Sequence, residues 1–146
     1  MRCMPLMNRA ALAFMVLVLS LSASVALAET VAVVSADNPV STLSRDQVVD
    51  IFLGKRNYFP DGRPAEPIDQ AEGSDTRDVF YLEVTGKSPA QVKAHWSKII
   101  FTGRGQPPRE AANSAEVKQY VAGNPNAIGY IDRKMMDGSV KAVLGQ

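Results

Sequence analysis

Cysteine and histidine are almost absent from this chain. Among its 146 residues there is one cysteine, Cys3, and one histidine, His95. A metal site built from several cysteines or histidines is therefore excluded, and so is a core stabilised by disulfides. Nucleophilic catalysis needs a nucleophile, a base and a group that orients the base, and no such set can be recognised. The acidic residues form no calcium-loop motif, so we expect a protein that is not an enzyme and uses no metal or cofactor.

An excess of charge of either sign is also missing. The whole chain has 16 Lys and Arg against 15 Asp and Glu, a net charge of +1. From residue 29 onward 14 basic residues face 15 acidic ones, a net charge of −1. This balance gives no electrostatic reason to bind nucleic acid or anionic lipid. Any bound anion must be held by a local group of donors.

The first 28 residues have the organisation of a secretory signal peptide. Arg2 and Arg9 form a positive start, residues 10–21 are apolar, and residues 26–28 read Ala-Leu-Ala, a small-residue cleavage site. An uncleaved membrane anchor is the alternative, but the apolar run is shorter than the roughly 20 residues that a spanning helix needs. We expect cleavage, export, and one compact domain of 118 residues, 29–146.

Strand and helix patterns alternate along this domain. Short β-branched or apolar runs predict strands, whereas serine or asparagine caps followed by apolar residues at helical spacing predict helices. The predicted strands are 30–35, 66–69, 127–131 and 140–144, and the predicted helices are 44–53, 74–85, 88–100 and 113–122. The alternation indicates an α/β domain in which helices cover a single mixed sheet.

The start of the second predicted helix gathers hydrogen-bond donors. The stretch Glu72 to Arg77 reads Glu-Gly-Ser-Asp-Thr-Arg, and the free amides of a helix start favour an anion. Ser74, Thr76 and Arg77 would add side-chain donors, and Gly73 would let a ligand approach the backbone closely. An ordinary helix cap by Ser74 is the alternative interpretation. The negative charges of Glu72 and Asp75 work against an anion.

A second candidate lies in the glycine-containing turn 101–105, where Arg104 could join backbone amides in a phosphate cradle. Such turns are common, and this one lacks the lysine of a nucleotide-binding loop. We expect His95 to be a solvated surface residue. Aromatic residues in the helices and strands are expected in the core, with the Tyr130 hydroxyl near the surface.

Several segments, taken in order, resemble the phosphate-binding proteins of bacterial ABC importers, which have the type 2 periplasmic binding fold. The segments are 43–55 with its Ile-Phe-Leu-Gly-Lys ending, 68–80, Trp96, the Phe-Thr-Gly turn at 101–103, and Asn-Pro-Asn-Ala-Ile-Gly-Tyr at 124–130. The likeness covers most of residues 29–146. It implies a periplasmic protein that binds phosphate or a similar oxyanion, without a cofactor, beside an ABC permease.

The same resemblance implies a set of ligand-binding residues and two departures from the family. Full-length members have two lobes that close on the ligand, and 118 residues suffice for about one lobe. The family's ligand loop has an arginine followed by a Ser-Gly-Thr triplet, whereas this chain has Gln70 at the arginine and Ser-Asp-Thr at 74–76. The resulting candidates are Gln70, Gly73, Ser74, Asp75, Thr76, Arg77 and Arg104. A second copy of the chain could close the site as a homodimer.

Two functions from different classes follow from these patterns. The first is a periplasmic solute-binding protein for phosphate or a similar oxyanion, held by the start of the helix at Ser74. The second is a non-enzymatic interaction or scaffold module that keeps one lobe of the fold, binds another envelope protein and has no ligand. The donor cluster favours the first, and the departures at Gln70 and Asp75 favour the second.

Overall fold

Five strands form one mixed sheet in the computed structural model, which describes residues 29–144. The strand order is β3-β2-β4-β1-β5, with β2 parallel to β3 and β4, and β1 antiparallel to β4 and β5. The strands are β1 (Thr30–Ser35), β2 (Glu66–Gln70), β3 (Arg109–Ala111), β4 (Ala127–Asp132) and β5 (Val140–Ala142). The prediction of an α/β domain with a mixed sheet is confirmed. The predicted signal peptide lies outside the described residues.

Polar caps set where the helices begin. The α-helices are α2 (Arg45–Phe52), α3 (Asp75–Thr85), α4 (Pro89–Phe101) and α5 (Ser114–Gly123), and a short 3-10 helix, η1 (Arg133–Met135), follows β4. Ser44 and Ser88 form capping boxes with the glutamines three residues later, and Asn113 caps α5. These caps satisfy amides that the helix itself leaves free. None of the helices in the described part is long and apolar enough to cross a bilayer.

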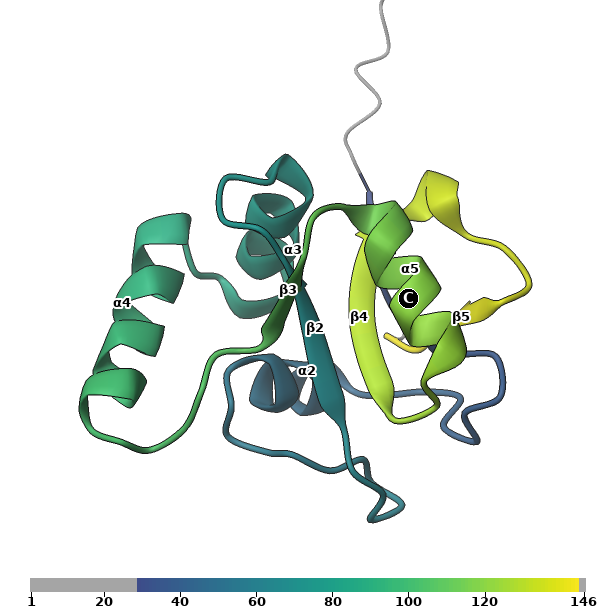
Figure 1. The fold of residues 1–146 in the computed structure, drawn as a ribbon, viewed down its shortest axis with the longest axis horizontal. Helices are drawn as coiled ribbons and strands as arrows, with labels where there is room; N and C mark the ends of the chain where they lie inside the picture. The colour runs from purple at the N-terminus through teal and green to yellow at the C-terminus, as the bar shows by residue number, and fades with distance from the viewer. Residues whose placement is uncertain (1–28, 145–146) are drawn as a thin grey trace, which may run out of the picture.

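The sheet buries side chains on both faces. Along β1, Val31 and Val33 join the cluster under α5, whereas Ala32 and Val34 join the larger cluster under α2 and α3. This alternation follows from the two-residue period of a strand. Figure 1 shows α5 over one face of the sheet and α4 standing at the side of the molecule, beyond β3. Only Val92 and Trp96 of α4 are buried, so this helix is attached along a narrow stripe.

One glycine sets how closely α5 packs on the sheet. A Cβ atom at Gly129, in the middle of β4, would lie 2.5 Å from Cγ1 of Val117 and 3.2 Å from Cγ2 of Val121. Both valines are fully buried on α5. A larger residue at this position would push the helix away from β4.

The structure differs from the sequence prediction in one strand. Residues 109–111 belong to none of the predicted strands or helices, but they form β3 and pair in parallel with Ile68 to Gln70 of β2. The sequence Arg-Glu-Ala has no β-branched residue, so its strand conformation comes from backbone pairing with β2 and not from side-chain preference.

Candidate functional site

The turn between β2 and α3 contains Gly73 and Ser74, two of the residues predicted from the sequence. Ser74 is the N-cap of α3, and its Oγ accepts a hydrogen bond from the amide of Arg77 at 3.3 Å. Gly73 has a φ of 89°, and no atom lies within 4 Å of the position of a Cβ there. The backbone is therefore open to approach at this turn. The amides of Asp75 and Thr76, the first two of α3, have no intrahelical acceptor.

The Ser74 hydroxyl already donates a hydrogen bond within the protein. Its acceptor is Oε1 of Gln70 at 3.0 Å. Gln70 is itself buried, and its Nε2 donates to Oγ of Ser114 and to the carbonyl of Tyr130, both at 3.1 Å. Gln70 thus connects the end of β2, the start of α3 and β4. A ligand oxygen would have to displace Gln70 to receive the Ser74 proton.

A buried carboxylate, that of Asp69, precedes Gln70 at the end of β2. Asp69 is 1% exposed and accepts hydrogen bonds from the Tyr81 hydroxyl at 2.8 Å, from the amide of Gln70 at 2.8 Å and from the Tyr130 hydroxyl. The Tyr130 hydroxyl is thus buried, and the expectation that it lies near the surface is wrong. Burial, and then the charge of Asp69, raise the pKa of both tyrosines well above the ordinary value. The tyrosines therefore remain protonated donors to the carboxylate.

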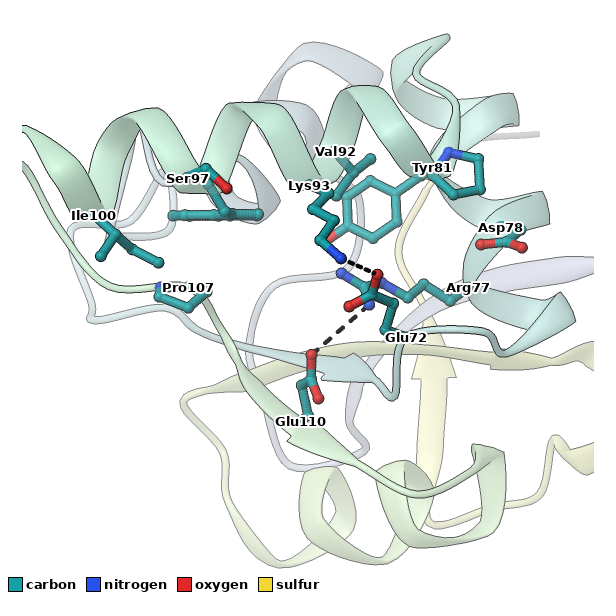
Figure 2. Close-up of a pocket in the computed structure, with 12 residues that line it drawn as sticks. Glu72, Arg77, Asp78, Tyr81, Val92, Lys93, Ser97, Ile100, Pro107 and Glu110 are labelled. Carbon is teal, nitrogen blue, oxygen red and sulfur yellow. Dashed lines mark hydrogen bonds and ion pairs between the residues drawn. The ribbon is translucent and has the colours of Figure 1, made fainter.

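Arg77 extends toward this carboxylate and not toward the open turn. Its Nη2 lies 3.6 Å from Oδ2 of Asp69, and its Nη1 lies 3.7 Å from Oε1 of Glu110. The guanidinium also lies over the ring of Tyr81, 5.7 Å from the centroid, and the side chain is 13% exposed. Figure 2 shows Arg77 and Glu110 facing each other at a cavity of about 200 Å³, with Glu72 and Lys93 beside them. The positive charge of Arg77 is thus shared by two carboxylates.

The remaining predicted residues are distributed differently. Asp75 is exposed and Thr76 half-buried in the first turn of α3, next to the open backbone at Gly73. Arg104 lines another cavity, together with Lys55, His95 and Lys98. No hydrogen bond or ion pair within residues 29–144 joins Arg104 to the start of α3. The structure therefore brings Gln70, Ser74 and Arg77 together but leaves Arg104 outside their network.

The sequence reasoning missed the centre of this network. Asp69 was read as the last residue of a short strand, and no role was given to it or to Tyr81. A signal was present, because an acidic residue directly after the apolar Ile68 in a strand is buried at a cost unless it has partners. Its partners come from α3 and β4, which are far away in sequence, so the network could be found only from the fold.

No protein-family model and no curated protein sequence matches this chain. Solved structures do match. A substrate-binding protein from Clostridium perfringens, described as a putative phosphate ABC transporter protein with bound phosphate, has a TM-score of 0.62 and 28% identity. An ABC-type phosphate transport receptor from Vibrio cholerae also has a TM-score of 0.62, at 22% identity. A possible phosphate binding protein from Planctomyces limnophilus has a TM-score of 0.54 at 16% identity.

These matches cover a large share of this chain but a smaller share of each solved chain. They include 79%, 78% and 80% of this chain, but only 44%, 44% and 41% of the respective solved chains. The chain thus spans less than half the length of the proteins that it matches. The resemblance predicted from the sequence is confirmed in the structure: the chain has the fold of a single lobe of a periplasmic binding protein, similar to that of phosphate ABC transporter substrate-binding proteins.

Proposed function

We propose that this chain is a periplasmic solute-binding protein for phosphate or a similar oxyanion, in or near an ABC-type uptake system. The observation that carries the proposal is the match to the Clostridium perfringens protein solved with bound phosphate, at 28% identity. The open turn at the start of α3 supplies a suitable place on this chain. Binding there uses hydrogen bonds and the helix dipole and includes no covalent step.

The donors at that turn define how the anion would be held. The amides of Asp75 and Thr76 have no acceptor within the helix, the Thr76 hydroxyl belongs to the same turn of α3, and Gly73 allows close approach. The Ser74 hydroxyl contributes when the anion replaces Gln70 as its acceptor. Arg77 contributes when it leaves Asp69 and Glu110. Because Glu72 and Asp75 add negative charge, we expect one lobe alone to bind weakly and a second copy or another chain to complete the site.

Calorimetric titration of the full chain, exported and purified from the periplasm, tests this function. We expect heat with phosphate or sulfate that Ser74→Ala and Thr76→Ala both abolish. Ser88→Ala is the matched control, because Ser88 caps α4 in the same way but lies at another helix start. The absence of heat with every oxyanion would contradict the proposal.

A second function is favoured by the internal pairing of the predicted donors. Ser74 donates to Gln70, and Arg77 is shared between Asp69 and Glu110, so both side chains have partners without a ligand. This arrangement fits a scaffold module that uses one lobe of the fold to bind another envelope protein. Cross-linking in the periplasm should then capture a defined partner. Recovery of the chain alone would contradict this second function.

A further inference from the structure

A basic groove lies where the C-terminal ends of α2 and α4 meet. It has a volume of about 410 Å³. Its lining residues come from the end of α2 and from the second half of α4 with the loop that follows: Leu53, Gly54, Lys55, His95, Lys98, Ile99, Thr102 and Arg104. No aspartate or glutamate lines it. We call this cavity the basic groove.

Two contacts hold the walls of the basic groove in place. Nε2 of His95 on α4 donates a hydrogen bond to the carbonyl of Leu53 at the end of α2, at 2.8 Å. His95 is half-buried, so the expectation of a solvated surface histidine is wrong. Gly54 has a φ of 76°, and a Cβ there would lie 2.7 Å from Cη2 of Trp96. The two helix ends are thus packed together, and Lys55 follows directly.

The three cations of the basic groove have no partners. Among residues 29–144, the side chains of Lys55, Lys98 and Arg104 make no ion pair or hydrogen bond, and all three are exposed. Two other lysines have partners, since Lys93 pairs with Glu72 at 3.2 Å and Lys118 pairs with Asp137 at 2.8 Å, whereas the side chains of Lys87 and Lys134 have none within residues 29–144. The groove therefore concentrates three positive charges in a chain whose residues 29–146 carry a net charge of −1.

These cations are not needed to satisfy the helix ends. Cations near a helix C-terminus commonly bind its free carbonyls. Here other groups do so, because His95 binds the carbonyl of Leu53, and the Thr102 hydroxyl donates to the carbonyls of Lys98 at 2.8 Å and Ile99 at 3.2 Å. The amide of Arg104 also donates to the carbonyl of Ile99 at 3.0 Å. The charged ends of all three side chains remain available.

We propose that the basic groove is a binding site for a small anion that carries two or more phosphoryl groups, of the class of pyrophosphate. Lys55 comes from one wall, and Lys98 and Arg104 come from the other, so an anion with two phosphoryl groups has a separate charge for each wall. Arg104 binds oxygen pairs in a bidentate manner, and the lysines act as point charges. This site is separate from the start of α3, and the inference does not depend on the proposed function.

Titration of the full chain with pyrophosphate at constant ionic strength tests the inference. We expect saturable heat, and we expect Lys98→Gln together with Arg104→Gln to weaken the affinity by about tenfold or more. Lys134→Gln with Lys87→Gln is the charge-matched control, because neither lysine lines the groove. Equal weakening in both pairs would show a general charge effect and overturn the inference. Absence of binding to the unaltered chain would also overturn it.

Two further measurements separate this site from the proposed oxyanion site. Ser74→Ala is expected to leave the pyrophosphate affinity within about twofold, since Ser74 does not line the groove. Backbone amide shifts on adding pyrophosphate should concentrate at residues 53–55 and 95–104. Shifts confined to residues 73–78 would place pyrophosphate at the start of α3 and overturn the inference.

Discussion

The start of α3 and the basic groove both gather hydrogen-bond donors, but they differ in whether those donors already have partners. At the start of α3, Ser74 donates to Gln70, and Arg77 lies between Asp69 and Glu110. In the groove the cationic ends of Lys98 and Arg104 face no carboxylate. The comparison teaches that a cluster of donors indicates a ligand only when the surrounding fold leaves those donors unused.

The largest effect should come from removing the Asp69 carboxylate, which accepts hydrogen bonds from two tyrosines and pairs with Arg77. Asp69→Ala leaves the hydroxyls of Tyr81 and Tyr130 without an acceptor and Arg77 with Glu110 alone. We expect the free energy of unfolding to fall by about 3 kcal/mol or more, because two buried hydroxyls lose their hydrogen-bond acceptor and a largely buried guanidinium loses one of its counter-charges. Chemical denaturation measures this change.

Asp69→Asn provides the comparison for that variant. The asparagine amide keeps an acceptor for one tyrosine but loses the charge. The free energy of unfolding of this variant should therefore lie between that of the unaltered protein and that of Asp69→Ala. Equal stability of Asp69→Ala and the unaltered chain would show that the network is not formed in solution. Arg77 would then be held by Glu110 alone.

The next effect is a loss of stability at alkaline pH. Burial beside Asp69 raises the pKa of Tyr81 and Tyr130 above the ordinary tyrosine value of 10.0. Below pH 10 the two tyrosines are protonated in both the folded and the unfolded chain, so their full contribution to the free energy of unfolding is present. Above it the unfolded chain loses its protons first, so the free energy of unfolding falls by up to about 1.4 kcal/mol per tyrosine and pH unit.

Denaturation curves at pH 9, 10.5 and 11.5 would measure this slope. Tyr81→Phe should reduce the slope while lowering the stability at pH 9, because the donor to Asp69 is lost. Tyr58→Phe is the control, since Tyr58 is 48% exposed. An unchanged slope in Tyr81→Phe would contradict the assignment of this tyrosine to the Asp69 network.

Local signals in the sequence predicted most of the fold. Ser44 and Ser88, each with a glutamine three residues later, predicted the starts of α2 and α4, and the structure has both capping boxes. The β-branched run 30–35 predicted β1 with the bounds observed. Such features depend on neighbours within four residues, so the sequence displays them directly.

Long-range pairing decided what the sequence could not predict. β3 forms through pairing with β2, and Asp69 is buried because its partners come from α3 and β4. The same reason separates Arg104 from Ser74. Both were candidates for one site on chemical grounds, but α4 carries Arg104 to the end of α2. The type of each residue indicated which interactions its side chain could make. The fold determined which neighbours it makes them with.

A smaller effect is expected from a substitution in the basic groove. Gly54→Ala places a Cβ 2.7 Å from Cη2 of Trp96 and requires a φ of 76° from alanine. We expect a loss of about 1–3 kcal/mol in the free energy of unfolding, because the end of α2 must move away from α4. Pyrophosphate affinity should fall as well, since Lys55 moves with it.

Gly138→Ala is the control for this variant, because nothing lies within 4 Å of the position of its Cβ and its φ is not positive. Its stability and pyrophosphate affinity should remain close to those of the unaltered protein. If Gly54→Ala lowered stability but left the affinity unchanged, the packing of α2 against α4 would not be what organises the groove.

The smallest effect is the difference in stability between two serine variants, one that removes only a helix cap and one that also removes the hydrogen bond to Gln70. Ser44→Ala removes only a helix cap and should lower stability by about 1 kcal/mol. Ser74→Ala removes a cap and also the bond to Gln70, so the expected loss is larger, about 2 kcal/mol. Thermal and chemical denaturation of the two variants measure the difference. Equal losses would mean that the bond to Gln70 contributes nothing in water, and that the Ser74 hydroxyl can turn to an anion without cost.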